Sequence, residues 1–173
     1  LADELSKLAA RVLCDGGACL VMTGLFYLPD VLALLGKNLD YYWVYCILTP
    51  GSATRMPMQH KRVANHWKAV VWLQKGKMQA KDMFEDVITY PPDAKADKTL
   101  HPHGQSVHVF SELVIRHSRP YDLVLDPFNG AGTTGIAAVS NGRRYIGVDI
   151  EESCVDITRQ RLAPLFDDNH PEI

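Results

Sequence analysis

Apolar residues follow two patterns along this chain: stripes at helical spacing and short continuous runs. Between Leu1 and Leu13, the residues Leu5, Leu8 and Val12 recur every three or four positions, which is typical of an amphipathic helix. Short apolar or aromatic runs that end at glycine, proline or a charged residue favour strands instead. Strands are predicted at residues 18–23, 41–48, 69–73, 87–90, 123–126 and 145–149. Helices are predicted at residues 1–13, 27–35, 107–117, 132–140 and 153–162. This alternation predicts an α/β domain with a mainly parallel sheet.

Size and composition limit the kind of protein this is. The 173 residues, of which 47% are hydrophobic, suffice for one compact domain, which we place at residues 1–173. The polar, proline-punctuated stretch 77–100 is expected to form loops or a small excursion, and residues 52–100 together are a possible excursion for DNA contact or target recognition. A net charge of −2 excludes strong attraction of the whole surface to nucleic acid or to an anionic membrane. Four cysteines without a Cys-x-x-Cys pair, and the lack of an apolar run of about 18 residues, predict a cytoplasmic protein without a membrane segment.

The strongest chemical signal is a glycine-rich segment between a predicted strand and a predicted helix. Gly130, Gly132 and Gly135 stand at Gly-x-Gly-x-x-Gly spacing shortly after the strand at 123–126. Backbone amides of such a turn, with the following helix N-terminus, attract an anionic or polar cofactor group, and glycine permits the tight turn. Asp149 follows the next strand, 19 positions after Gly130, where a carboxylate can accept hydrogen bonds from ribose hydroxyls. The segment therefore predicts a cofactor site, and the alternative is a tight turn with Asp149 as a helix cap.

Two stretches around this loop carry a family resemblance. The sequence DPFNGAGTT at residues 126–134, followed by NGRRYIGVDIEE at residues 141–152, resembles the cofactor motif of S-adenosylmethionine-dependent DNA amino-methyltransferases. The order of the motifs is similar to that of the permuted group, in which the catalytic motif lies upstream of the cofactor loop. The resemblance implies a Rossmann-like methyltransferase sheet with helices on both faces, permuted and incomplete at its N-terminus. It also implies S-adenosylmethionine as cofactor and methyl transfer to N6 of adenine or N4 of cytosine in double-stranded DNA, as in restriction-modification systems.

The same resemblance implies roles for individual residues. The loop residues that would line the cofactor are Asp126, Pro127, Phe128, Asn129, Gly130 and Gly132, with Thr133 and Thr134 at the helix N-terminus and Asp149 on the ribose. The stretch from His101 to Ser106 resembles the His-Pro-x-x-Lys-Pro element that precedes the loop in this family, with a neutral Gln105 where lysine is usual. Gln105 and Ser106 would reach the methionine carboxylate, and His101 belongs to the same cofactor site. His101 and His103 have no cysteine or acidic cluster nearby, so no metal is expected.

A basic segment is the candidate DNA surface. Residues 52–81 contain seven lysines or arginines and no acidic residue, with two histidines and two tryptophans between them. Such a segment in a nearly neutral protein is typical of a surface that follows phosphates. Arg55, Lys61 and Arg62 are the candidate DNA contacts, and the alternative is a solvated loop. Because the excursion is short, target recognition is expected to need a partner chain or a homo-oligomer.

The catalytic motif of the resembled family does not occur in this sequence. That motif is Asp, Asn or Ser followed by two prolines and an aromatic residue; its polar groups bind the target amino group and its ring stacks on the flipped base. Tyr90-Pro91-Pro92-Asp93 is the reverse of this motif and is expected to lie in a loop without a catalytic role. We therefore expect the catalytic strand to precede Leu1, and this chain alone to be inactive. Two alternatives stay open: a nicotinamide or flavin dinucleotide-binding oxidoreductase fragment, and a non-catalytic DNA-binding relic of a methyltransferase.

Overall fold

The computed structural model of the chain describes residues 1–48, 54–58, 63–77, 83–90 and 105–166, and these divide into two compact units, Leu1–Thr89 and Tyr90–Ile173. The first unit contains α1 (Ala2–Val12), β1 (Ala18–Thr23), η1 (Leu25–Tyr27), α2 (Leu28–Leu35), β2 (Asp40–Leu48), β3 (Thr54–Met58), β4 (Val63–Asn65), β5 (Trp67–Gln74) and β6 (Val87–Thr89). The second unit contains α3 (Val107–His117), β7 (Leu123–Asp126), α4 (Thr133–Ser140), β8 (Arg144–Gly147), α5 (Glu152–Leu162) and η3 (Ala163–Leu165). Among the described helices, none combines the length and the apolarity needed to cross a bilayer.

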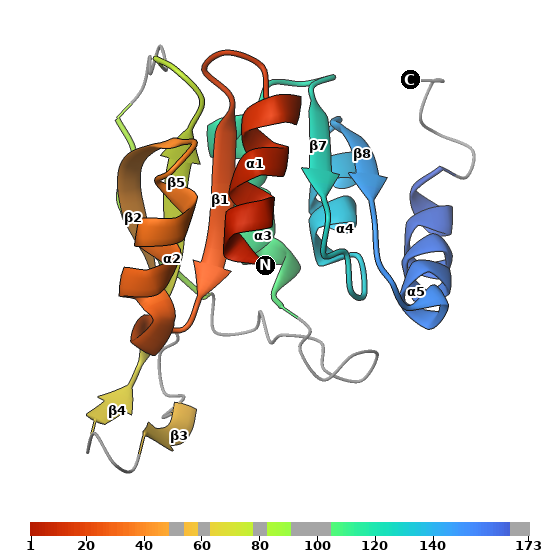
Figure 1. Cartoon of the computed structure of the whole chain (residues 1–173). Helices are drawn as coiled ribbons and strands as arrows, with labels where there is room; N and C mark the ends of the chain where they lie inside the picture. The colour runs from red at the N-terminus through yellow and green to blue at the C-terminus, as the bar shows by residue number, and fades with distance from the viewer. Residues whose placement is uncertain (49–53, 59–62, 78–82, 91–104, 167–173) are drawn as a thin grey trace. The chain divides into compact units, whose positions relative to one another are not determined.

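The first unit is built on a four-stranded sheet with the strand order β1-β5-β2-β6 (Figure 1). Strand β5 lies between β1 and β2 and runs antiparallel to both, whereas β2 and β6 are parallel. The sheet is therefore mixed, and the expectation of a mainly parallel sheet is wrong for this unit. The reason is the connection from β2 to β5, which includes the antiparallel β3–β4 pair and no described helix. A parallel strand would require a crossover, whereas a chain that turns back adds an antiparallel one.

Helices α1 and α2 contribute the core of the first unit together with this sheet. Ala9 of α1 and Leu35 of α2 are buried in one cluster with Val71 and Leu73 of β5. Val71 and Leu73 share a face of the sheet because side chains alternate along a strand. Leu5 of the predicted stripe packs against this cluster together with Leu13, whereas Val12 is 50% exposed, so the stripe is only partly the face that α1 turns toward the sheet.

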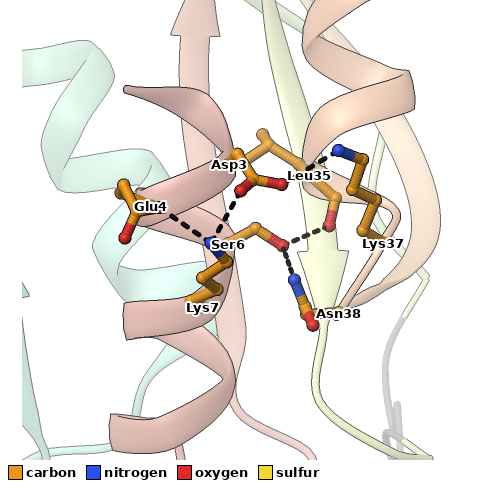
Figure 2. Close-up of polar contacts among 7 residues, drawn as sticks. All are labelled: Asp3, Glu4, Ser6, Lys7, Leu35, Lys37 and Asn38. Atoms are coloured by element: carbon orange, nitrogen blue, oxygen red, sulfur yellow. Dashed lines mark hydrogen bonds and ion pairs between the residues drawn. The ribbon is translucent and has the colours of Figure 1, made fainter.

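A polar contact joins α1 to the end of α2 (Figure 2). Ser6 is fully buried; its Oγ donates to the main-chain oxygen of Leu35 over 2.8 Å and accepts from Asn38 Nδ2 over 3.1 Å. At the surface of the same contact, Asp3 pairs with Lys37 over 3.0 Å and with a lysine one helical turn away. Hydrogen bonds from the two ammonium groups lower the pKa of Asp3 to about 2. The contact between the two helices is therefore held by polar groups as well as by the apolar cluster.

The second unit places β7 and β8 side by side as a parallel pair, connected through α4 (Figure 1). Asp126, the last residue of β7, is in register with Gly147, the last residue of β8. Arg143 is buried and fixes the start of β8 to the end of α3, since its guanidinium donates to Ser118 Oγ over 3.0 Å and to Ser118 O over 2.7 Å. Because the strands are parallel, the glycine-rich loop after β7 and the acidic segment after β8 leave the same edge of the sheet.

Candidate cofactor site

The glycine-rich loop connects the end of β7 to the start of α4 and is braced by the carboxylate of Asp126. Asp126 Oδ1 accepts the amide hydrogen of Phe128 over 3.0 Å, and Oδ2 accepts the hydroxyl of Thr134 over 2.5 Å. The first contact is an aspartate turn, in which the side chain replaces a main-chain acceptor. The second reaches the first turn of α4. One carboxylate thus fixes both the entry and the exit of the loop.

Asp149 lies against the same loop, as the spacing of the motif predicts. Its Oδ2 accepts the amide hydrogen of Gly130 over 2.7 Å, and its Oδ1 accepts the amide hydrogen of Glu151, the residue that caps α5, over 3.0 Å. The main chain adds a further tie, because the Asn129 amide donates to Val148 O over 3.0 Å. The carboxylate therefore joins the loop to the residue before α5; the N-cap of that helix is Glu151 and no side chain caps it, so the alternative interpretation of Asp149 as the helix cap is wrong.

The glycines of the motif serve different purposes. Gly132 has a φ of 75°, and a methyl group there would lie 2.6 Å from the side chain of Thr158 in α5. A methyl group at Gly135 would lie 2.6 Å from the ring of Tyr145. Gly130 also has a positive φ, 50°, but its nearest neighbour would be the Phe128 main-chain oxygen at 4.0 Å. Glycine is therefore required at 132 and 135 by packing inside the protein, whereas among the described residues nothing lies closer than 4.0 Å to a methyl group at Gly130.

Asn129 is the most enclosed side chain of the loop, with 5% of its surface exposed. Its Oδ1 accepts the Tyr145 hydroxyl over 2.6 Å, while its Nδ2 donates to Thr158 Oγ1 over 2.7 Å and to Gly130 O over 3.0 Å. Burial, and then the nearby Asp126 carboxylate, raise the pKa of Tyr145, so this phenol remains a donor. Sequence reasoning placed Asn129 on the cofactor; the structure turns its side chain toward Tyr145 and Thr158.

The contacts from α5 and β8 were missed in the sequence. Thr158 lies in the middle of α5 and Arg161 in its last turn, and the guanidinium of Arg161 donates to the main-chain oxygen of Ala131. Neither residue belongs to a motif, and a single sequence carries no signal that pairs it with a loop nearly thirty residues earlier. The glycine at 132 indicates that a neighbouring group packs closely against this position, but the sequence does not show that this group is Thr158.

The remaining predicted cofactor residues divide into exposed and buried positions. Phe128 presents its ring to solvent, with 53% of its surface exposed, whereas Thr133 at the start of α4 is buried. Ser106 is buried at the N-terminus of α3 next to the half-buried Gln105. The phenol of Tyr90 lies at the Ser106 main chain: burial raises the pKa of Tyr90, and the hydrogen bond with the Ser106 backbone opposes that shift. Tyr90, which sequence reasoning set aside, is thus brought to one of the predicted cofactor residues.

Several predicted positions lie outside the described residues. These are His101, His103, Lys61, Arg62 and Asp93. Arg55 lies within β3, of which the structure describes the backbone course alone at that position. Pro127 follows β7 directly in the described loop. Within the described ranges, no group of three or more histidine, cysteine or acidic side chains is placed to hold a metal ion.

Comparisons with known proteins indicate the family and the fold of the chain. Residues 2–160 match the family model N6_N4_Mtase, described as DNA methylase. The chain is 37% identical over 90 residues to the type II methyltransferase M2.DpnII of Streptococcus pneumoniae, a match that covers 52% of this chain and 32% of that protein. It is similar in structure to the M1.HpyAVI–SAM complex, with a TM-score of 0.78 and 21% identity over 92% of this chain and 81% of that chain. It is also similar to PvuII DNA methyltransferase (cytosine-N4-specific), with a TM-score of 0.75 and 18% identity over 99% of this chain and 72% of that chain.

These matches establish the fold and the family. The matches to the curated relatives span about a fifth to a third of the length of those proteins, between 19% and 32%. The two structural similarities extend over nearly the whole chain, so the fold is the Rossmann-like methyltransferase fold. With the family model covering residues 2–160, the chain belongs to the DNA methylase family of N6/N4 amino-methyltransferases.

Proposed function

We propose that this chain binds S-adenosylmethionine at the loop from Asp126 to Thr134 and forms part of an enzyme that methylates DNA. The reaction would transfer a methyl group to the exocyclic nitrogen of adenine, N6, or of cytosine, N4, in double-stranded DNA. The observation that carries the proposal is the loop between β7 and α4, joined by the Asp149 carboxylate to the segment after β8. In parallel α/β sheets, ligands bind at this carboxyl edge of the strands.

The residues present fit such a cofactor. The space at Gly130 admits a ligand close to the main chain, because among the described residues the nearest atom to an added methyl group would be the Phe128 oxygen at 4.0 Å. The first amides of α4 have no acceptor within the helix and point toward the same edge. The exposed ring of Phe128 supplies an apolar surface beside them. Asp149, in the segment after β8, is the acceptor that would take the ribose hydroxyls.

The cofactor and the residues of the chain would contribute different parts of the reaction. When bound, S-adenosylmethionine supplies a methyl group on a sulfonium, which is already a good leaving centre. The chain's own residues would bind and orient that cofactor, and orientation with exclusion of water accounts for much of the rate in a displacement of this kind. The relatives named above include a type II methyltransferase and a cytosine-N4-specific enzyme, which supports DNA and an exocyclic amine as substrate.

The DNA contact is proposed at the basic segment of residues 52–81. Arg55, Lys61 and Arg62 would contact phosphates, because they belong to a stretch with seven basic and no acidic side chains. The length of the segment favours target recognition shared with a partner chain or a second copy. Replacing the three residues together by serine should lower affinity for duplex DNA and reduce its dependence on salt, whatever the DNA sequence.

The experiment that tests the proposed function is a calorimetric titration of the purified chain. S-adenosylmethionine and S-adenosylhomocysteine should bind with one site per chain, and NADH should not bind. In a parallel assay, transfer of tritium from labelled S-adenosylmethionine to unmethylated duplex DNA measures methylation. Binding of NADH without binding of either sulfur compound would overturn the proposal and favour an oxidoreductase.

A further inference from the structure

We propose that Thr158 is a positioning residue of the cofactor site, which acts through a hydrogen-bonded lock formed by Asn129, Tyr145 and Thr158. This assignment rests on the proposed function, since it concerns how the same loop is prepared for its ligand. The lock joins three elements that are distant in the sequence: the loop after β7, strand β8 and helix α5. Neither Thr158 nor Tyr145 belongs to the glycine motif.

The direction of each hydrogen bond in the lock is fixed by chemistry. The main-chain oxygen of Gly130 can only accept, so the Asn129 atom 3.0 Å from it is the nitrogen, and the other amide atom, the oxygen, accepts the Tyr145 hydroxyl over 2.6 Å. Asn129 Nδ2 must then donate to Thr158 Oγ1, over 2.7 Å, and the Thr158 hydroxyl lies 3.0 Å from the carbonyl of Cys154 one turn earlier in α5. An asparagine amide satisfies this order because it accepts at one end and donates at the other.

The lock holds the main chain of Gly130 on the side of α5. Gly130 O lies 3.0 Å from Asn129 Nδ2 and 3.3 Å from Thr158 Oγ1. In a trans peptide the carbonyl oxygen and the next amide hydrogen point in opposite directions. With Gly130 O directed toward α5, the amide hydrogen of Ala131 is directed away from it. Thr158 therefore sets the orientation of a main-chain donor without contacting the ligand.

A second contact keeps Thr158 in place. The side chain of Thr158 lies directly against Gly132, where a methyl group would approach to 2.6 Å. Arg161, one turn further along α5, donates to Ala131 O and holds the following peptide group in the same way. The loop is thus attached to α5 by two of its carbonyl groups, and the Ala131 amide is directed to the opposite side, whereas the Gly130 amide donates to Asp149 and the Gly132 amide donates to Asn129 O. This arrangement is what a site for an anionic or hydroxyl-bearing ligand requires.

The test compares two substitutions of nearly the same size at Thr158. Thr158→Val replaces the hydroxyl by a methyl group, and Thr158→Ser keeps the hydroxyl and removes the methyl group. We expect Thr158→Val to weaken S-adenosylhomocysteine binding about tenfold and Thr158→Ser to restore affinity to within about twofold of the wild type. Thr23→Val in β1 of the first unit is the matched control for the substitution and should leave affinity unchanged.

Two further measurements separate positioning from a purely structural role. Tyr145→Phe removes the first donor of the lock and keeps the ring that packs at Gly135, so it should weaken binding in the same direction as Thr158→Val. Thermal unfolding without ligand should differ little between Thr158→Val and Thr158→Ser, because a lost hydroxyl and a lost methyl group have similar effects on stability. A fall in melting temperature for Thr158→Val with affinity unchanged would overturn the assignment.

The outcomes distinguish this assignment from the function on which it rests. If the wild-type chain binds S-adenosylhomocysteine and every Thr158 variant binds it equally well, the positioning role is wrong and the proposed function stands. If the wild-type chain does not bind the compound, the proposed function is wrong and the assignment falls with it. If affinity is lost in Thr158→Val and restored in Thr158→Ser, both are supported.

Discussion

Replacing Gly130 by alanine separates access of the ligand from stability of the fold. Gly130 has a φ of 50°, and the added methyl group would meet nothing closer than the Phe128 oxygen at 4.0 Å. The left-handed region costs an alanine about 1–2 kcal/mol, so the free energy of unfolding should fall by about that amount and no more. The methyl group would instead enter the open space that a cofactor approaches. Affinity for S-adenosylhomocysteine should therefore fall at least about tenfold, which corresponds to about 1.4 kcal/mol.

Gly142 is the matched control for this substitution. It has a φ of 73° and nothing within 4 Å of an added methyl group, and it lies in the turn before β8, at the other end of that strand from the loop. Gly142→Ala should cost the same stability and leave affinity unchanged. Gly132→Ala should behave differently from both, because its methyl group would lie 2.6 Å from Thr158 and the loss of stability should exceed that of Gly142→Ala.

Two measurements decide the comparison. Urea unfolding monitored by circular dichroism gives the free energy of unfolding for each variant, and calorimetric titration gives the dissociation constant of S-adenosylhomocysteine. The reasoning predicts equal losses of stability and unequal losses of affinity for Gly130→Ala and Gly142→Ala. Equal affinity in these two variants would show that the ligand does not approach Gly130, and the proposed site would have to move.

Three further predictions concern other parts of the chain. Ser6→Ala should lower the free energy of unfolding by about 1–3 kcal/mol, since a buried hydroxyl that donates to Leu35 O at the end of α2 and accepts from Asn38 is lost; urea unfolding measures this, and no change would contradict it. Asp149→Asn should weaken S-adenosylhomocysteine binding about tenfold, because the charged acceptor at the loop is removed; unchanged affinity in a folded variant would leave this residue only its bonds to the Gly130 and Glu151 amides. Burial, and then a neighbouring arginine, lower the pKa of His117 to about 4, so the unfolded chain takes up this proton near pH 6.5 and the folded chain only near pH 4. The free energy of unfolding should therefore fall by up to about 3 kcal/mol between pH 6.5 and 4. His117→Gln should remove this pH dependence, and the control His108→Gln, at an exposed site of the same helix, should keep it.

Most helices and strands could be predicted because their local sequence determines them. The helix predicted at 107–117 and the strand predicted at 123–126 have those same bounds in the structure. Strand β1 also has the predicted bounds, but all six of its residues are half-buried, whereas a continuous apolar run predicts burial on both faces. Burial depends on what packs over a strand, and that information is not contained in the strand itself.

Strands β3 and β4 were not predicted, and neither was the direction of β5. Met56 and Pro57 in β3 lie in a polar, basic stretch whose composition is typical of a loop. The direction of β5 depends on whether the preceding chain crosses over the sheet or turns back. The connection from β2 to β5 determines this direction, and its sequence has the weakest pattern of apolar and polar residues. The alternation of predicted strands and helices therefore favoured a parallel arrangement.

The candidate site was predictable to the extent that its parts are neighbours in one β-α-β unit. Asp149 reaches Gly130 because β7 and β8 are adjacent, parallel and in register, and the spacing of the motif depends on that arrangement. Tyr90 could not be placed in the same way, since the residues between it and α3 carry no regular pattern. Its contact with the Ser106 backbone depends on the folded course of that connection.

The glycine motif combines two constraints that look identical in a sequence. At Gly130 the constraint is the left-handed turn and the open space in front of it, whereas at Gly132 it is also the side chain of Thr158. A bulky residue at Gly132 would therefore displace α5 before it could obstruct a ligand, and the bonds from Thr158 to Gly130 O and from Asn129 to Thr158 would break with it. Loss of binding in a Gly132 variant consequently reports on the attachment of the loop to α5, and only substitution at Gly130 reports on the ligand itself.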